Sequence, residues 1–255
     1  MNTRTISALP THSGALLEQL PPEAHVWFTI PESIRDPGTL ADCLAMLCEQ
    51  ERERYRRFHF PADRHRFLVS HALVRRVLSR YVDLPPADWT FLNSGHGRPE
   101  ISNPGLPALR FNLTHTDGLA ACVVTLASEC GIDAERIVAR HNPAGVAQRM
   151  FSASECEQMQ RLSAREQLEY FFRRWTLREA YVKARGIGIS FPTRKLQFAI
   201  DERENIQVQF ADGIDDTGRH WQFRLLYPTP QHIVALALGL EDSTERRIVS
   251  REFSW

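Results

Sequence analysis

An internal repeat is the feature that most restricts how this chain of 255 residues can fold. The segment RFLVSHALVRR (66–76) resembles RWTLREAYVKA (174–184), further along the chain. Two further pairs come in the same order: 82–91 with 189–198, and 111–126 with 223–238. Each copy combines a helical pattern, a proline-containing turn and strand segments. Three pairs in one order and at nearly constant spacing favour a duplication over chance similarity of two amphipathic helices.

The duplication predicts an α+β fold, a pseudo-dimer of two similar halves with a crevice between them to which both halves can contribute one site. We place the halves at residues 1–129 and 130–255. We expect residues 1–25 to be a loose lead-in to the first strand, HVWFTI. In the helical repeat His71 stands opposite Glu179, so the helix does not need a carboxylate there in order to fold.

Composition argues against strong non-specific binding to nucleic acid or to an anionic membrane. The 31 Lys and Arg side chains balance 31 Asp and Glu side chains, so electrostatic binding must come from local clusters. The apolar runs LAACVVTLA and IVALALGL are too short to span a bilayer, and the N-terminus has no signal-peptide pattern. The five cysteines show no metal-binding spacing, which favours buried, reduced thiols. We therefore expect a cytoplasmic protein.

A carboxylate interrupts the apolar stripe of the second repeated helix. The apolar positions of this stripe are Leu168, Phe172 and Trp175. The next position is Glu179, and Lys183 follows on the same face. Two interpretations stay open. The carboxylate turns outwards and pairs with Lys183, or it points inwards because a ligand meets it there.

Two more carboxylates, Asp133 and Glu135, follow a predicted strand in the segment GIDAER. On extended backbone they point to the same side. If they lay within about 4 Å of Glu179 without a cation, each pair would repel by about 4 kcal/mol at an effective dielectric of about 20. Hard oxygen ligands without a Cys/His cluster favour Mg²⁺ over zinc. On the spacing alone, a strand end in water is the slightly favoured interpretation.

Three further segments carry groups suited to an anionic ligand. FNLTHTDG places Thr114 and His115 beside a turn, where they can grip a phosphate, although a histidine satisfied within the turn is commoner. SGHGRPEI places Arg98 in a predicted hairpin, where it can contact a phosphate or stack on a base. The run RERYRRFHFPADRHRF includes Arg54 and Arg66, and such a run is usually a solvated helix face. In a neutral chain it fits an anionic small molecule better than nucleic acid.

The order of these segments resembles one family, the 4′-phosphopantetheinyl transferases of the surfactin-synthetase-activating type. The matching motifs are the basic run with Asp63 and Arg66, GRP at 97–99, FNLTH at 111–115, GIDAE at 131–135 and WTLREAYVKARGIG at 175–188. The combination GxDxE followed by W[ST]xxE[AS]xxK is specific at this separation, whereas either motif alone is weaker. The family's fold is a pseudo-dimer of two α+β halves, in agreement with the repeat.

The resemblance also implies roles for single residues. It assigns Asp133, Glu135 and Glu179 to Mg²⁺. It assigns the phosphates and the adenine end of coenzyme A to Arg54, Arg66, Arg98, Thr114 and His115, and the pyrophosphate region to Lys183. Within this scheme Glu179 is our predicted base. Two departures from the family pattern are Thr114 in place of a frequent serine and Arg98 in place of a common lysine, and the latter changes the geometry of the charge.

The implied reaction transfers the phosphopantetheine arm of coenzyme A to a serine of an apo acyl or peptidyl carrier protein, with Mg²⁺, and releases adenosine 3′,5′-bisphosphate. A Mg²⁺-dependent hydrolase of coenzyme A or a related diphosphate is the first alternative, because metal and phosphate contacts do not specify the nucleophile. An inactive binding module would have lost a metal ligand, and none is lost. A nucleic-acid-binding protein is suggested only by the arginine run. An internally duplicated site favours a monomer.

Overall fold

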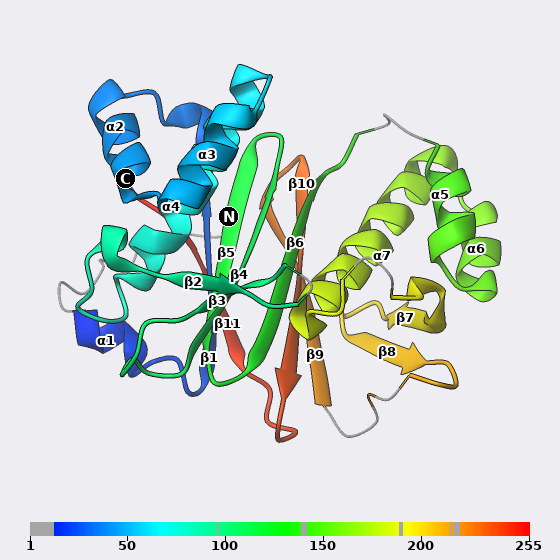
Figure 1. Ribbon diagram of the computed structural model, residues 1–255. Helices are drawn as coiled ribbons and strands as arrows, with labels where there is room; N and C mark the ends of the chain where they lie inside the picture. The colour runs from blue at the N-terminus through cyan, green and yellow to red at the C-terminus, as the bar shows by residue number, and fades with distance from the viewer. Residues whose placement is uncertain (1–12, 96, 139–141, 189–190, 215, 217–219) are drawn as a thin grey trace, which may run out of the picture.

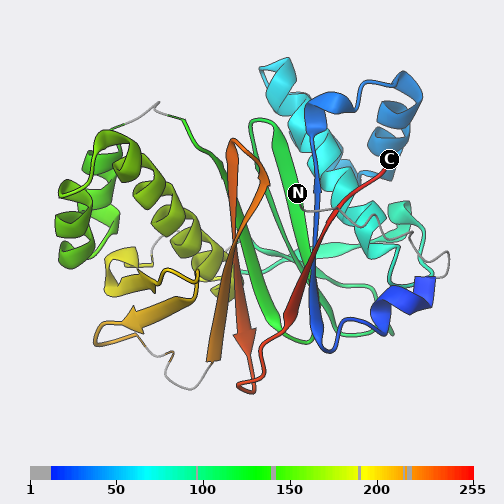
Figure 2. The same cartoon turned by 180° about the vertical axis from the view of Figure 1, so that it is seen from behind.

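The computed structural model describes residues 13–95, 97–138, 142–188, 191–214, 216 and 220–255. Residues 189 and 190, which begin one of the predicted repeat segments, lie outside this part. Two sheets stand side by side, with the long helix α4 on the outer side of one and the long helix α7 on the outer side of the other (Figures 1 and 2). The first-half elements are α1 (Ser13–Leu17), β1 (Glu23–Thr29), η1 (Pro31–Ser33), α2 (Pro37–Met46), α3 (Glu49–Arg57), α4 (Pro61–Leu78), η2 (Pro86–Asp88), β2 (Phe91–Asn93), β3 (Pro99–Ile101), β4 (Leu109–Thr116) and β5 (Leu119–Leu126). The later elements are β6 (Glu129–Arg136), α5 (Pro143–Met150), α6 (Ala153–Gln160), α7 (Ala164–Arg185), η3 (Thr193–Lys195), β7 (Leu196–Ile200), β8 (Ile206–Phe210), β9 (His220–Thr229), β10 (His232–Leu240) and β11 (Arg247–Glu252).

Three strands of each main sheet follow the same order, β1-β5-β4 in the first sheet and β6-β10-β9 in the second. The first runs β11-β1-β5-β4 and the second β6-β10-β9. The central strand β5 pairs antiparallel with β1 and β4, and β10 pairs in the same way with β6 and β9. Each half adds one small hairpin, β2–β3 or β7–β8. The predicted pseudo-dimer of two α+β halves is confirmed.

A buried ion-pair network fastens the helices of the first half to each other. Glu51 accepts a hydrogen bond from the backbone at the start of α3 and contacts both His71 (2.9 Å) and Arg75 (2.6 Å) of α4. Arg75 also donates to the carbonyl of Trp89, just before the small hairpin (2.7 Å). Burial alone would raise the pKa of Glu51, but the hydrogen bond from His71 and the charges of His71 and Arg75 hold it at about 2.

The second half repeats this network with different residues. Glu155 accepts from the backbone at the start of α6 and pairs with Arg178 and with Arg174, the latter at 3.7 Å. Arg178 donates to the carbonyl of Leu196 at the start of the small hairpin (2.8 Å). Both networks join a capping carboxylate, the long helix and the hairpin, because a buried guanidinium needs several acceptors at once.

These networks correct the predicted register of the repeated helix. Arg75 and Arg178 make the same contacts and are therefore counterparts, whereas the sequence alignment set Arg75 opposite Lys183. In the corrected register His71 corresponds to Arg174, and the counterpart of Glu179 is Arg76. The apolar stripe of a helix recurs every three to four positions, so several registers match it about equally well in sequence.

The predicted strand alignment is right for one strand and displaced by a single position in the next. Thr114 of β4, which the alignment set opposite Leu226 of β9, pairs with Ala121, and Leu226 pairs with Val234. The counterpart of Ala121 is therefore Val234, whereas the alignment placed Ile233 there. The second hairpin accommodates the extra position by a register irregularity between His232 and Val234.

Side chains, not a backbone ladder, connect the two sheets. On one side the backbone N–H groups of Ile132 and Ala134 in β6 donate to Asn112 Oδ1 and Thr114 Oγ1 of β4 (3.0 and 3.1 Å). The strand β11 returns to the first half and pairs in parallel with β1. The division into residues 1–129 and 130–255 stays a prediction. The strand β11 belongs to the second of these ranges but pairs with β1 of the first.

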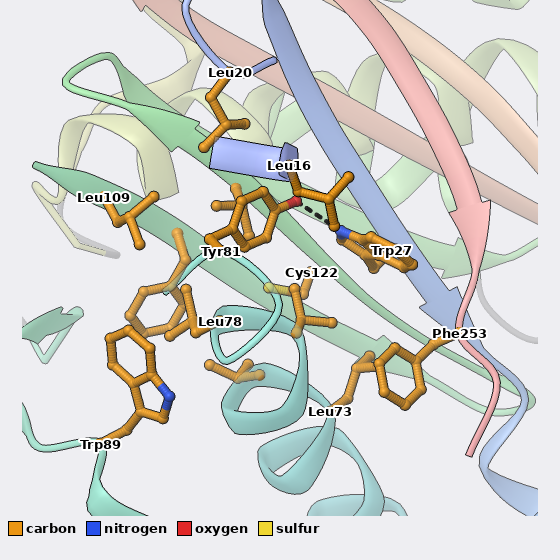
Figure 3. Close-up of a cluster of buried hydrophobic side chains, with 14 of the residues drawn as sticks. Leu16, Leu20, Trp27, Leu73, Leu78, Tyr81, Trp89, Leu109, Cys122 and Phe253 are labelled. Atoms are coloured by element: carbon orange, nitrogen blue, oxygen red, sulfur yellow. Dashed lines mark hydrogen bonds between the residues drawn. The ribbon is translucent and has the colours of Figure 1, made fainter. Parts of the chain in front are cut away.

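The segment before β1 packs on the core through Leu16 and Leu20, which corrects the expectation of a loose lead-in for this part of the segment. Leu16 and Leu20 are 3% and 1% exposed and belong to the core of the first half. Figure 3 shows them beside Tyr81 and Trp27, whose indole donates to the tyrosine hydroxyl at 2.8 Å. Residues 1–12 of the predicted lead-in lie outside the described residues.

All five cysteines are free thiols, as expected, but burial is confirmed only for Cys43, Cys122 and Cys130. Cys48 is exposed at the start of α3, and Cys156 is partly exposed. Within the described residues, every helix falls short of the length and apolar character needed to cross a membrane.

Candidate active site

The site begins where α7 lies directly against β6. The two elements approach so closely at Gly131 that a Cβ atom there would stand 2.0 Å from the carbonyl oxygen of Ala180 and 2.4 Å from the nitrogen of Ala184. Only glycine permits this contact. The close approach brings Glu179 and Lys183 of α7 to the face of β6 that carries Asp133 and Glu135.

Asp133 is held mainly by a lysine. Its Oδ1 atom lies 2.7 Å from Lys183 Nζ, and Lys183 also donates to Thr114 Oγ1 (3.3 Å) and to the carbonyl of Ile132 (3.2 Å). Asp133 is 7% exposed, and its Oδ2 atom is buried without a hydrogen-bond partner among the described residues. An unsatisfied buried carboxylate oxygen is costly unless a ligand completes it.

Glu135 and Glu179 are half-buried beside Asp133. Burial, followed by the charge of Asp133, raises the pKa of Glu135 to about 7, although a hydrogen bond from Trp175 Nε1 (3.1 Å) opposes the shift. Burial and the charge of Asp133 also raise the pKa of Glu179. Of the two interpretations left open by the sequence, an outward ion pair of Glu179 with Lys183 is not found among the described residues, where Lys183 pairs with Asp133.

These carboxylates fit a hard divalent cation in their chemistry. Within the described residues, no group of three His, Cys, Asp or Glu side chains is already gathered tightly enough to hold a metal ion. Carboxylates repel one another in the absence of a cation. The Oδ2 atom of Asp133 has no partner among the described residues, and burial together with the charge of Asp133 raises the pKa values of Glu135 and Glu179. The donor set is therefore suited to Mg²⁺, with Lys183 as the present neutralising group.

The first half supplies Thr114 and His115 from the end of β4. Thr114 is buried, and its hydroxyl is shared between the Ala134 N–H and Lys183. The His115 side chain is exposed. Partial desolvation there, followed by the positive charges of His71 and other neighbours, Arg66 and Lys183 among them, lowers the pKa of His115 to about 4. The surroundings of His115 are thus rich in positive charge, as a phosphate site requires.

Three predicted arginines lie around this centre with different degrees of freedom. Arg66 of α4 is tied to Asp63 (3.2 Å) and to Asp117, in the turn after β4. Arg54 of α3 is exposed, with its guanidinium carbon 5.4 Å from the ring centre of Phe67. Each of these guanidinium groups has donors left for a ligand, since five N–H groups are available.

Arg98 lies on the predicted hairpin but reaches the second half. Its Nη1 donates to the carbonyls of Ala184 (2.5 Å) and Lys183 (3.4 Å), in the last turn of α7, which is capped by Gly186 in left-handed conformation. A cation at a helix C-terminus is stabilised by the helix dipole and by the free carbonyls. Arg98 therefore also fixes the end of the helix that carries Glu179 and Lys183.

A pocket of about 330 Å³ opens beside Glu135. Its walls include Thr116 and Asp117 from the first half and Phe171, Phe172 and Trp175 from α7. Sequence reasoning gave Trp175 only to the apolar stripe, although it donates to Glu135. The tryptophan that begins the WTLRE motif was the available signal. From the sequence, Asp117 was expected only to be a turn residue. His232, which contacts the turn that contains Asp117, was given no role.

Comparison with known proteins shows which family the chain resembles. The family model described as "4'-phosphopantetheinyl transferase superfamily" matches residues 129–237, and "4'-phosphopantetheinyl transferase, N-terminal" matches residues 36–130. The 4′-phosphopantetheinyl transferase HetI of Nostoc sp. is 30% identical over 224 residues, 88% of this chain and 90% of that relative. The transferase Sfp of Bacillus subtilis is 29% identical over 66% of this chain and 73% of its own length. A holo-(acyl-carrier-protein) synthase structure from Bacillus anthracis in complex with CoA covers 44% of this chain and 97% of its own, at 19% identity and a TM-score of 0.37.

The chain belongs to the 4′-phosphopantetheinyl transferase family. It is an enzyme of the class that transfers the phosphopantetheine arm of coenzyme A to carrier proteins, which confirms the predicted function. The alternative of a hydrolase of coenzyme A is not favoured by these relatives.

Proposed function

We propose that Asp133, Glu135 and Glu179 hold Mg²⁺ for this transfer, with coenzyme A bound along the crevice between the halves. The observation that carries the proposal is the buried, unsatisfied Oδ2 atom of Asp133 on β6, beside Glu135 and Glu179, whose pKa values the charge of Asp133 helps to raise. When bound, the ion would stabilise the charge that develops on the pyrophosphate oxygens as the bond to the leaving group breaks.

In this scheme Lys183 changes its partner during the reaction and Glu179 accepts a proton. Lys183 exchanges its bond to Asp133 Oδ1 for the pyrophosphate, because a flexible ammonium can follow the negative charge. The Glu179 carboxylate accepts the proton of the attacking carrier serine, directly or through a water.

The first half supplies the contacts to the phosphates and the adenine end. His115 and Thr114 lie next to Lys183 and are proposed to bind phosphate oxygens, together with Arg66 and Arg54. Arg98 offers its remaining N–H groups to the same ligand while it holds the end of α7. The pocket beside Glu135, with its floor of aromatic side chains, suits the pantetheine chain.

The finer assignments about partners follow the same scheme. We propose an apo acyl or peptidyl carrier protein as the acceptor and a monomer as the working unit, because one chain supplies both walls of the crevice. A cytoplasmic location agrees with a substrate that is a soluble cofactor. Neither nucleic acid nor a membrane is required, since the basic run of α3 is partly neutralised by its own acidic residues.

The test is intact mass spectrometry of an apo acyl carrier protein incubated with this protein, coenzyme A and Mg²⁺, beside a sample with chelator. We expect a mass gain of one phosphopantetheine that disappears with chelator and returns when Mg²⁺ is added in excess. Cleavage of coenzyme A in the absence of any carrier would contradict the transfer scheme.

The assignment of Arg66 has its own test. Arg66→Ala should raise the KM for coenzyme A by at least about tenfold, because a charged hydrogen bond to the 3′-phosphate is lost. Dephospho-coenzyme A lacks this phosphate, so its KM should change little. An equal rise for both substrates would contradict the assignment.

A further inference from the structure

A buried histidine of the second half holds a turn of the first half. His232, the first residue of β10, is 5% exposed. Its Nε2 atom lies 2.7 Å from the backbone carbonyl oxygen of Asp117, and its Nδ1 atom lies 2.6 Å from Thr229 Oγ1. Since a carbonyl only accepts, Nε2 carries the proton, and Nδ1 accepts from the threonine hydroxyl. Every polar atom of this imidazole is therefore used.

The turn that His232 holds belongs to the candidate active site. It connects β4, which carries Thr114 and His115, to β5. The Asp117 carboxylate binds Arg66 of α4, and the Gly118 N–H donates to Glu32 at 3.3 Å. His232 reaches this turn from the other half of the molecule.

The turn and the histidine are fitted to each other. Gly118 has a φ of +82°, and a Cβ atom there would stand 3.1 Å from the His232 ring. A side chain at position 118 would therefore be strained in its backbone and crowded by the imidazole. In the first half the strand counterpart of His232 is Leu119, which is fully buried and apolar. The histidine is thus a feature of the second half only.

We propose that His232 is a positioning residue for the 3′-phosphate end of coenzyme A. By fixing the carbonyl of Asp117, it fixes the direction of the Asp117 carboxylate and so the orientation of the Arg66 guanidinium. This inference rests on the proposed function, because it uses Arg66 as the 3′-phosphate contact. His232 touches no reacting atom in this scheme and acts only through the turn.

Two substitutions separate the hydrogen bond from mere filling of space. His232→Leu restores the residue type of the first half and removes the donor to Asp117. His232→Gln keeps an N–H donor at about the reach of Nε2. We expect His232→Leu to raise the KM for coenzyme A about five- to tenfold, the range expected when one hydrogen bond that orients a charged group is lost. The KM for dephospho-coenzyme A and kcat should stay within about twofold, and His232→Gln should return the KM for coenzyme A close to that of the wild type.

A matched control and a second variant guard against a purely structural effect. Gln222 is also a buried polar residue, whose side chain exchanges two hydrogen bonds with the backbone of Arg246, far from the turn. Gln222→Leu should lower the melting temperature without changing either KM. If His232→Leu does not fold, Gly118→Ala places a methyl group against the His232 ring, displaces the turn from the imidazole and should give the same selective rise for coenzyme A.

The outcomes distinguish this inference from the proposed function. If Arg66→Ala is selective for coenzyme A and His232→Leu raises both KM values equally or neither, the positioning role is wrong. If Arg66→Ala itself shows no selectivity, the 3′-phosphate assignment fails first. Selectivity in both, with rescue by His232→Gln, would establish the positioning role.

Discussion

The two halves of the molecule build one framework and fill it with opposite chemistry. Val26 of β1 pairs with Val123, and Ile132 of β6 pairs with Leu236. Because Val123 and Leu236 are counterparts in the two central strands, Val26 corresponds to Ile132, and both lie in the core between the sheets. The next residue along each strand lies on the face that carries the long helix. It is Trp27 in the first half and Asp133 in the second.

The contacts at these counterparts are equivalent in place and different in kind. Lys183 of α7 pairs with Asp133, whereas Arg80, its counterpart just beyond α4, lies over the ring of Trp27 at 5.2 Å. Figure 3 shows Trp27 in its apolar surroundings, hydrogen-bonded to Tyr81. A cation therefore occupies the same place in both halves, over an aromatic ring in one and beside a carboxylate in the other.

The positions of the other two carboxylates show the same contrast. The counterpart of Glu135 is Thr29, and its hydroxyl accepts a hydrogen bond from the Trp255 indole at 2.8 Å. The counterpart of Glu179 is Arg76, whose guanidinium lies 5.4 Å from the ring centre of Trp255. Trp255 thus lies in the first half between the counterparts of two acidic site residues.

This difference teaches that the framework does not depend on the carboxylates. In the first half, the counterparts of the site residues make aromatic and cation–π contacts, which are favourable without any ligand. The second half leaves a buried oxygen of Asp133 without a partner among the described residues and two glutamates with raised pKa values. Such a local loss of stability is typical of a functional site.

The largest expected effect comes from the third carboxylate and its counterpart. Glu179→Gln should reduce phosphopantetheine transfer by at least about 1,000-fold, because several kcal/mol of metal-dependent stabilisation are lost, while coenzyme A binding stays largely intact. Arg76→Gln, at the same place in the first half, should leave the transfer rate unchanged and reduce stability by about 1 kcal/mol at most. Intact mass of the carrier and calorimetry of coenzyme A binding measure both. Wild-type activity of Glu179→Gln would remove this residue from the mechanism.

The next effect is on the contact of α7 with β6. Gly131→Ala should reduce the free energy of unfolding by about 3 kcal/mol, because the added methyl overlaps the helix backbone. The first half has His25 at this place, where a whole imidazole is buried and bonded to Tyr81 (2.9 Å). The midpoint of urea unfolding is the measurement. Gly95→Ala is the control, since a Cβ there meets nothing within 4 Å, and similar losses in both variants would contradict the close-approach argument.

A smaller effect follows from the titration of Glu135, whose counterpart Thr29 carries no charge. Without metal, the folded protein binds this proton up to a pH of about 7, against an ordinary pKa of 4.5, so Glu135 makes the fold less stable as pH rises through that window. The lowered pKa of His115 has the opposite effect, because it makes the fold more stable as pH rises towards the ordinary value of 6.5. The difference between the wild type and Glu135→Gln isolates the carboxylate.

In chelator, the free energy of unfolding of the wild type relative to Glu135→Gln should decrease by about 1 to 3 kcal/mol between pH 5 and pH 8. Urea unfolding at both pH values measures it, and added Mg²⁺ should reverse the decrease. Parallel pH profiles of the two proteins would show that Glu135 keeps an ordinary pKa in the folded state.

The smallest effect concerns the cation that both halves keep. Lys183→Gln should increase the affinity for Mg²⁺ in the absence of coenzyme A by about tenfold, because the metal no longer competes with an ammonium for Asp133. Titration calorimetry with Mg²⁺ alone measures this. Arg80→Gln, over Trp27, should leave metal affinity unchanged, and weaker Mg²⁺ binding by Lys183→Gln would contradict the competition.

Much of this arrangement could be predicted from the sequence because it is local or repeated. The alternation of a strand placed Asp133 and Glu135 on one side of their segment. The periodicity of a helix placed Glu179 and Lys183 on one face. Turn residues placed Thr114 and His115 beside a turn. The register of the helical repeat could not be obtained in this way, since amphipathic helices match at several offsets.

The sequence by itself determined the family, the duplication and the residue types of the site, because these depend on motif and periodicity. The tertiary structure alone decided which groups meet. It placed Lys183 on Asp133, Trp175 on Glu135 and Arg98 on the end of α7, and it brought His232 to a turn in the other half of the chain. Such contacts join residues far apart in the chain, so they depend on how the sheets and helices pack and not on any local pattern.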